Sequence, residues 1–127
     1  MVGRLVLVLG DQLTETLSAL AQADKGRDTV VMAEVADEAA YVRHHPKKIA
    51  LIFAAMRKFA HALEQDGWKV VYTQLDDTDN AGSIVGELLR RAAQTGASEV
   101  LATEPGEWRL IDKLKYAPLK VHLLPDD

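Results

Sequence analysis

The polar residues best suited to chemistry stand directly after short apolar runs. Gly10-Asp11-Gln12, Glu34 and Glu104 each follow such a run. Side chains of these types hold ligands by hydrogen bonds, and paired carboxylates can also perform general acid–base chemistry. A glycosidase pair could be drawn from Glu34, Glu38 and Glu104, but acids at strand ends are common and their spacing here is not diagnostic. These residues therefore favour a binding site over a catalytic one.

Other catalytic patterns are absent from the sequence. The chain has no cysteine, and none of its serines stands in a G-x-S-x-G elbow. It contains neither the dinucleotide fingerprint G-x-G-x-x-G nor a phosphate loop, and no His-x-x-x-His or clustered carboxylate spacing. We therefore expect no catalytic residue and no metal ligand in this chain.

Three features allow two interpretations each. Asp11 could hydrogen-bond a ligand or cap the helix that follows it. The basic run at residues 43–48 could meet an anionic partner or form a solvated turn. Glu104-Pro105-Gly106 is typical of a turn that would project Glu104 and Trp108 over a crevice, although Trp108 could instead be a packing residue. The sequence alone leaves these alternatives open.

The composition is that of one ordinary globular domain, residues 1–127. The chain has 19 acidic and 15 basic residues, a net charge of −4, and 48% hydrophobic residues. Such a composition disfavours disorder and a stand-alone DNA-binding role. Disulfides and a cysteine-held iron–sulfur cluster are excluded within the chain. The apolar runs are too short for a membrane helix or a signal peptide, so we expect a cytoplasmic protein without membrane contact.

Apolar runs alternate with helical patterns along the chain. Strands are predicted at residues 5–9, 29–33, 70–72, 100–102 and 121–124. One helix is expected after Asp11, a long one at residues 46–65 that ends before Gly67, and one around residues 84–92 with Asn80 as its cap and Gly96 at its end. The long helix is apolar all round in its middle, which indicates either a second neighbour or simply exposed alanines and Leu51.

This alternation predicts the fold class. We expect a Rossmann-like α/β domain: a doubly wound, five-stranded parallel sheet with strand order 3-2-1-4-5 and helices on both faces. In such sheets the ligand lies beyond the carboxyl ends of the strands, at the point where the strand order reverses. That point falls between the first and fourth strands, where Gly10 and Glu104 are expected.

Several motifs in order carry a family resemblance. They are Leu9-Gly10-Asp11-Gln12-Leu13, Glu34-Val35, Glu38-Ala39-Ala40-Tyr41-Val42, His44-His45, Lys47-Lys48-Ile49-Ala50, Ala55-Met56-Arg57, Asp76-Asp77, Asp79-Asn80 and Thr103-Glu104-Pro105-Gly106-Glu107-Trp108. The chain resembles the N-terminal domain of photolyase-related proteins, the iron–sulfur bacterial cryptochromes and (6-4) photolyases of the cryptochrome/photolyase superfamily. The resemblance spans nearly the whole chain and thins after Arg109.

The resemblance implies an antenna role. In that family this domain holds a light-harvesting chromophore, 6,7-dimethyl-8-ribityllumazine. A longer helical C-terminal part carries FAD, a [4Fe–4S] cluster and the groove for damaged DNA. On this basis we expect an N-terminal fragment whose partner is that C-terminal domain. The fragment would not be catalytic by itself, whereas the parent would be a (6-4) DNA photolyase, a lyase, or a related photoreceptor.

The resemblance also implies a chromophore pocket. Its residues would be Gly10, Asp11, Gln12, Glu34, Glu38, Tyr41, Lys48, Ile49, Ile52 and Glu104. Within this set, Glu38 and Lys48 would hydrogen-bond the ring or the ribityl chain, and Ile49 and Ile52 would form an apolar wall. The alternatives from other classes are a stand-alone flavin- or nucleotide-binding Rossmann-like module and a partner-binding domain without catalysis.

Overall fold

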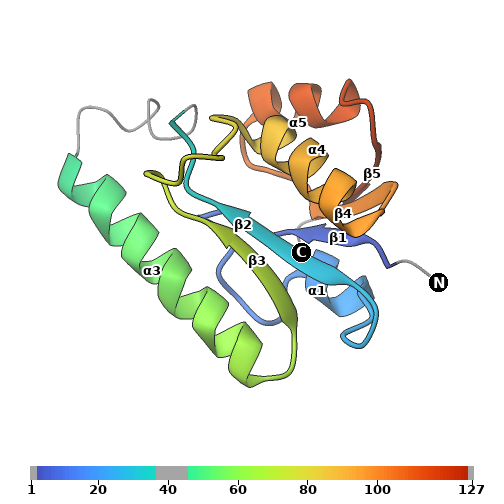
Figure 1. The fold of residues 1–127 in the computed structure, drawn as a ribbon, viewed down its shortest axis with the longest axis horizontal. Helices are drawn as coiled ribbons and strands as arrows, with labels where there is room; N and C mark the ends of the chain where they lie inside the picture. Colours follow the sequence, from blue (N-terminus) through green and yellow to red (C-terminus); the bar gives the residue numbers. More distant parts are fainter. Residues whose placement is uncertain (1–2, 37–45, 126–127) are drawn as a thin grey trace.

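Five parallel strands form a single sheet at the centre of the molecule (Figure 1). A computed structural model of the chain describes residues 3–36 and 46–125. The strands are β1 (Leu5–Leu7), β2 (Thr29–Ala33), β3 (Lys69–Thr73), β4 (Glu99–Thr103) and β5 (Lys120–Leu124). Their order is β3-β2-β1-β4-β5, and every neighbouring pair is parallel. The predicted doubly wound fold and strand order are therefore confirmed.

Helices cover both faces of this sheet. They are α1 (Ser18–Gln22), α3 (Pro46–Gln65), α4 (Ile84–Thr95) and α5 (Trp108–Lys115). Figure 1 shows α3 and α4 on opposite sides of the sheet. Leu20 of α1 and Leu63 of α3 belong to one buried cluster, and Leu88 of α4 and Leu114 of α5 to the other. The two layers of core explain why the central strands are apolar on both faces.

The central strand β1 pairs with β2 on one side and β4 on the other. Leu7 stands opposite Val31 of β2 and Ala102 of β4. Residues 5–9 are all buried, although the strand itself ends at Leu7. Because β1 separates the two halves of the sheet, its carboxyl end is the place where the strand order reverses.

Helix boundaries differ from the sequence predictions at two N-termini. Helix α1 begins at Ser18, well after Asp11, and its N-cap residue Leu17 makes no side-chain cap hydrogen bond. Asp11 therefore does not cap this helix, because a turn separates the two. Helix α4 is capped by Ser83, whose hydroxyl accepts a hydrogen bond from the Gly86 amide, so the prediction of Asn80 as its cap was wrong.

Other helix ends follow the predictions. Helix α3 spans Pro46–Gln65, and Gly67 adopts a φ of 95° just beyond it. Helix α4 ends at Gly96 in a left-handed conformation with a φ of 79°, which glycine adopts at little cost. Leu51 on the outer side of α3 is 71% exposed, so within this chain no described element covers it. No helix among the described residues is both long and apolar enough to cross a membrane.

Candidate ligand pocket

A cavity opens at the carboxyl end of β1, between the two helix layers. Its volume is about 190 Å³. Its lining comes from the ends of β1, β2 and β4 and from α3, α4 and α5: Leu9, Gly10, Asp11, Ala33, Ile49, Ile52, Phe53, Met56, Ile84, Pro105, Gly106, Glu107 and Leu110. This is the place at which sheets of this topology bind ligands.

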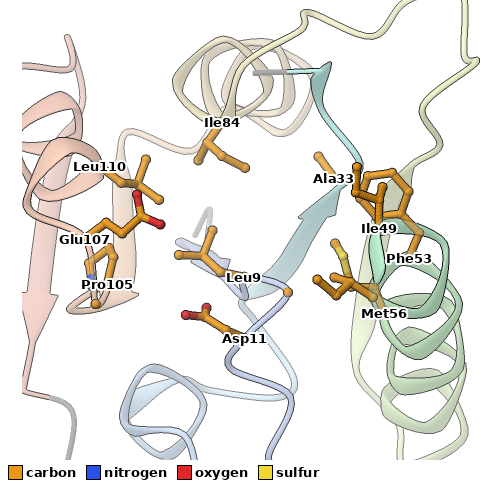
Figure 2. A pocket seen from close by; sticks show the side chains of 13 residues that line it. Leu9, Asp11, Ala33, Ile49, Phe53, Met56, Ile84, Pro105, Glu107 and Leu110 are labelled. Carbon is orange, nitrogen blue, oxygen red and sulfur yellow. The ribbon is translucent and has the colours of Figure 1, made fainter. Parts of the chain in front are cut away.

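The cavity has an apolar wall and an acidic edge. Figure 2 shows Ile49, Phe53 and Met56 of α3 on one side, with Asp11 and Glu107 on the side away from them. The Glu107 carboxylate points into the space from the loop before α5, and Asp11 follows β1. An aromatic ring could pack against the α3 wall while its polar substituents reach the carboxylates.

Gly10 allows α3 to approach the end of β1. A Cβ atom on Gly10 would lie 2.9 Å from Cγ2 of Ile52 and 3.2 Å from Sδ of Met56. Both distances are shorter than ordinary van der Waals contacts, so a side chain here would push the α3 wall outward. The absence of a side chain at Gly10 thus has a steric role, because side chains of α3 approach its backbone.

Gln12 holds the loop that carries Gly10 and Asp11. Its Oε1 accepts a hydrogen bond from the Leu9 amide at 3.3 Å, and its Nε2 donates to the Thr103 carbonyl at 3.1 Å. The side chain is buried and does not line the cavity. It therefore ties the end of β1 to the end of β4, which positions the acidic edge without contacting a ligand.

Glu34 follows β2 and is completely buried, yet it also lies outside the lining. Nε and Nη2 of Arg57 donate to its two carboxylate oxygens at 2.6 and 2.8 Å. The Tyr72 hydroxyl donates at 2.5 Å and the Leu75 amide at 3.1 Å. Since Arg57 follows Met56 along α3, this cluster fastens the apolar wall to the sheet.

These contacts set the protonation of the Glu34 cluster. Burial by itself raises the pKa of Glu34, but the hydrogen bonds from Arg57, Tyr72 and Leu75 outweigh it and hold the pKa below its ordinary value of 4.5. Burial and the adjacent carboxylate raise the pKa of Tyr72 above its ordinary value of 10.0. The cluster therefore stays charged as a carboxylate–guanidinium pair with a neutral phenol near neutral pH.

A second buried carboxylate, Glu87, holds the segment that leads into α4. It accepts hydrogen bonds from the Arg90 guanidinium, the Thr73 hydroxyl and the Ala81 amide. Burial raises its pKa, but the contacts with Arg90 and Thr73 leave it lowered overall. Because Ile84 stands at the start of α4 and lines the cavity, this network positions one side of the pocket.

The structure brings some of the predicted pocket residues together and leaves others apart. Gly10, Asp11, Ile49 and Ile52 line the cavity. Gln12 and Glu34 lie behind it, while Lys48, Glu104 and Trp108 are exposed and outside the lining. Glu38 and Tyr41, like the His44-His45 pair, lie outside the described residues.

Several lining residues were not among the predicted ones. Phe53 and Met56 share the apolar stripe of Ile49 and Ile52, so helical periodicity could have indicated them. Ile84 begins α4 and Leu110 lies in the first turn of α5, both on the opposite face of the sheet from α3, and nothing local in the sequence marks them as pocket residues. Glu107 directly follows the predicted turn Glu104-Pro105-Gly106, where Glu104 was the residue predicted to line the pocket.

The polar chemistry of the described lining is limited to carboxylates and backbone groups. The lining holds no hydroxyl, thiol or imidazole among the described residues. Across residues 3–36 and 46–125, no group of three or more His, Cys, Asp or Glu side chains is placed to hold a metal ion. What the cavity offers is an apolar surface and two hydrogen-bond-accepting carboxylates.

Sequence comparison places this architecture in a known family. The model for the family described as "Deoxyribodipyrimidine photo-lyase-related protein" matches residues 6–127. The chain belongs to this family. Among curated members, a (6-4) photolyase from Agrobacterium fabrum (strain C58 / ATCC 33970) is 53% identical over 107 residues. That match covers 84% of this chain but only 21% of the relative, so the photolyase-related chain spans a small part of that protein's length.

Proposed function

We propose that this chain is the light-harvesting domain of a photolyase-related protein and that its cavity holds 6,7-dimethyl-8-ribityllumazine. The observation that carries the proposal is the cavity at the carboxyl end of β1, with an apolar α3 wall facing an acidic edge. Membership in the photolyase-related family supports the chromophore class.

The dimensions and lining of the cavity fit a small heterocycle. Its volume of about 190 Å³ lies below the roughly 300–1,000 Å³ that is typical of sites for larger ligands. A complete dinucleotide such as FAD would be too large for this space. A bicyclic ring fits against Phe53 and Met56, and the hydroxyls of a ribityl chain could donate hydrogen bonds to Asp11 and Glu107.

The residues of this chain would hold and orient the chromophore. Ile49, Ile52 and Phe53 would exclude water from one face of the ring, while Gly10 keeps the α3 wall close. When bound, a lumazine absorbs light and passes its excitation energy to a flavin elsewhere in the protein. Energy transfer of this kind requires rigid positioning, which the apolar α3 wall would supply.

The remaining predicted pocket residues keep distinct places in this proposal. Hydrogen bonds from Glu38 and Lys48 to the chromophore stay predictions, since Glu38 is outside the described residues and Lys48 is exposed on the first turn of α3. Gln12 and Glu34 would act by holding the loop and the helix that line the cavity.

The repair chemistry would belong to the rest of a longer parent protein. We propose that a helical C-terminal domain there carries FAD and a [4Fe–4S] cluster and acts on damaged DNA in the cytoplasm. One fact supports this: the match covers only 21% of the relative named a (6-4) photolyase.

Titration with the lumazine tests the proposal. The purified 127-residue chain should bind 6,7-dimethyl-8-ribityllumazine with one site per chain, as measured by the polarisation of lumazine fluorescence. Phe53→Ala should weaken binding about tenfold, because it removes part of the apolar wall. Phe59→Ala is the control, since Phe59 is a partly buried residue of α3 that packs against the same core cluster and does not line the cavity. Absence of lumazine binding, or equal effects of the two substitutions, would contradict the proposal.

A further inference from the structure

The charge of the cavity lining is one-sided. Asp11 and Glu107 are its ionisable members, and no Lys, Arg or His lines it among the described residues. Both carboxylates lie along the same edge, away from α3 (Figure 2). The polar end of any ligand in this cavity therefore meets two hydrogen-bond acceptors that carry negative charge.

The described cations on the neighbouring elements lie outside the lining of the cavity. Arg109 approaches Glu107 with an Nη2–Oε2 distance of 3.7 Å, but Arg109 is not part of the lining. Lys47 and Lys48 are exposed on the first turn of α3 and also lie outside the lining. The chain as a whole carries a net charge of −4, so the wider field does not favour an anion either.

The helix N-terminus beside the cavity carries a carboxylate at its N-cap position. Phosphate groups commonly sit at a helix N-terminus, where free backbone amides and the helix dipole attract anions. The α5 N-terminus borders the cavity, but its N-cap residue is Glu107. A carboxylate at that position repels a second anion, whereas it accepts hydrogen bonds from hydroxyls.

We propose that Asp11 and Glu107 make this pocket selective for a chromophore with a free polyol chain over its phosphate ester. The inference rests on the proposed function in taking the cavity as the chromophore site. It adds the two residues that would set specificity, since Asp11 and Glu107 would favour the uncharged ribityl chain over a phosphorylated one. Phosphorylated forms of the same ring would be rejected by charge rather than by shape.

Matched ligand pairs test this selectivity. The first pair is 6,7-dimethyl-8-ribityllumazine and its 5′-phosphate, and the second is riboflavin and FMN. Each is titrated into the 127-residue chain at low ionic strength, with dissociation constants from fluorescence polarisation. We expect the phosphate ester to bind at least about tenfold more weakly than the free alcohol. The difference should shrink as added salt screens the carboxylates.

Two variants connect the effect to its residues. The double variant Asp11→Asn/Glu107→Gln keeps the size of both side chains and removes both charges, so it should reduce the ratio of the two dissociation constants to about threefold or less. Glu104→Gln is the control, because Glu104 is an exposed acid of the same loop outside the lining. It should leave the ratio unchanged.

The outcomes separate this inference from the proposed function. If lumazine does not bind but riboflavin binds better than FMN, the chromophore assignment fails and the selectivity stands. If lumazine binds and its phosphate binds equally well, or if the double variant keeps the full ratio, the selectivity is overturned and the antenna proposal stands. Binding by none of the four compounds overturns both.

Discussion

Arg57 and Glu34 form a two-pronged ion pair that joins helix α3 to the carboxyl end of β2. The two nitrogen–oxygen distances are 2.6 and 2.8 Å. The Glu34 side chain is fully buried while that of Arg57 is about half exposed (51%). Ala33 and Met56, the neighbours of these two residues in sequence, both line the cavity. The ion pair therefore fixes the separation between two walls of the pocket.

Glu34→Gln should destabilise the domain. The amide keeps the shape of the side chain but loses the charge that Arg57 and Tyr72 contact, at an expected cost of about 2 kcal/mol in the free energy of unfolding. Urea denaturation at neutral pH measures this. Glu64→Gln removes an exposed carboxylate from the same helix and should change the free energy little. Equal stability of the two variants would show that the ion pair contributes nothing.

Acid should remove the contribution of this ion pair. The pKa of Glu34 is lower in the folded chain than its ordinary value of 4.5, so its stabilisation is complete above that value and is lost as the pH falls through it towards the folded pKa. The difference in unfolding free energy between wild type and Glu34→Gln should therefore be constant near neutral pH and shrink below about pH 4.5. A difference that grows with acid would contradict the lowered pKa.

Gly10→Ala should both weaken ligand binding and destabilise the fold. The added Cβ would meet Ile52 at 2.9 Å and Met56 at 3.2 Å, an overlap that costs about 1–3 kcal/mol in stability. Gly106→Ala is a matched control, since Gly106 also lines the cavity and an added Cβ there would meet nothing within 4 Å. Adding Ile52→Ala to Gly10→Ala should relieve part of the strain, as measured by thermal unfolding. If the double variant is no more stable than Gly10→Ala, the loss of stability would come from a changed conformation of the loop after β1 and not from contact with Ile52.

Ser83→Ala should shorten or loosen the start of α4. The Ser83 hydroxyl accepts a hydrogen bond from the Gly86 amide at 3.0 Å. Loss of such a cap lowers the free energy of unfolding by about 1 kcal/mol. Ser98→Ala, at an exposed loop position, provides the comparison in urea denaturation. If both variants unfold at the same urea concentration as wild type, the Ser83 cap does not contribute to the stability of the fold.

Ligand binding should stabilise the folded chain by mass action. At a free lumazine concentration about 100 times its dissociation constant, the gain is about 2.7 kcal/mol. The midpoint of thermal unfolding should rise with lumazine concentration, and less steeply in Phe53→Ala. A midpoint that does not respond to lumazine would mean that lumazine does not bind the folded chain in preference to the unfolded chain.

The sequence indicated the fold well because its signals are local and repeated. Runs such as residues 29–33 have no polar face, and helical stripes separate them, so strand order followed from the handedness of the crossovers. The end of α4 was equally clear, since Gly96 adopts the left-handed backbone that a helix stop uses. Its start was not, because Asn80 and Ser83 are both good cap residues, and it is the Ser83 hydroxyl that accepts a hydrogen bond from a helix amide.

The pocket was harder to predict because proximity to a strand end does not decide where a side chain points. Glu34 stands at such an end, yet its carboxylate turns to Arg57 and Tyr72, two residues far away in sequence. Gln12 likewise turns to Thr103. Buried polar groups need partners, and these partners are known only once the elements have packed.

The strand order has a consequence for how the pocket comes into being. One wall belongs to α3, in the first half of the chain, and the facing edge belongs to the loop before α5, near its end. The strands that carry them are on opposite sides of β1. Most of the chain must therefore fold before both sides of this cavity are in place. A probe molecule that binds only the complete cavity would then report on the folding of both halves at once.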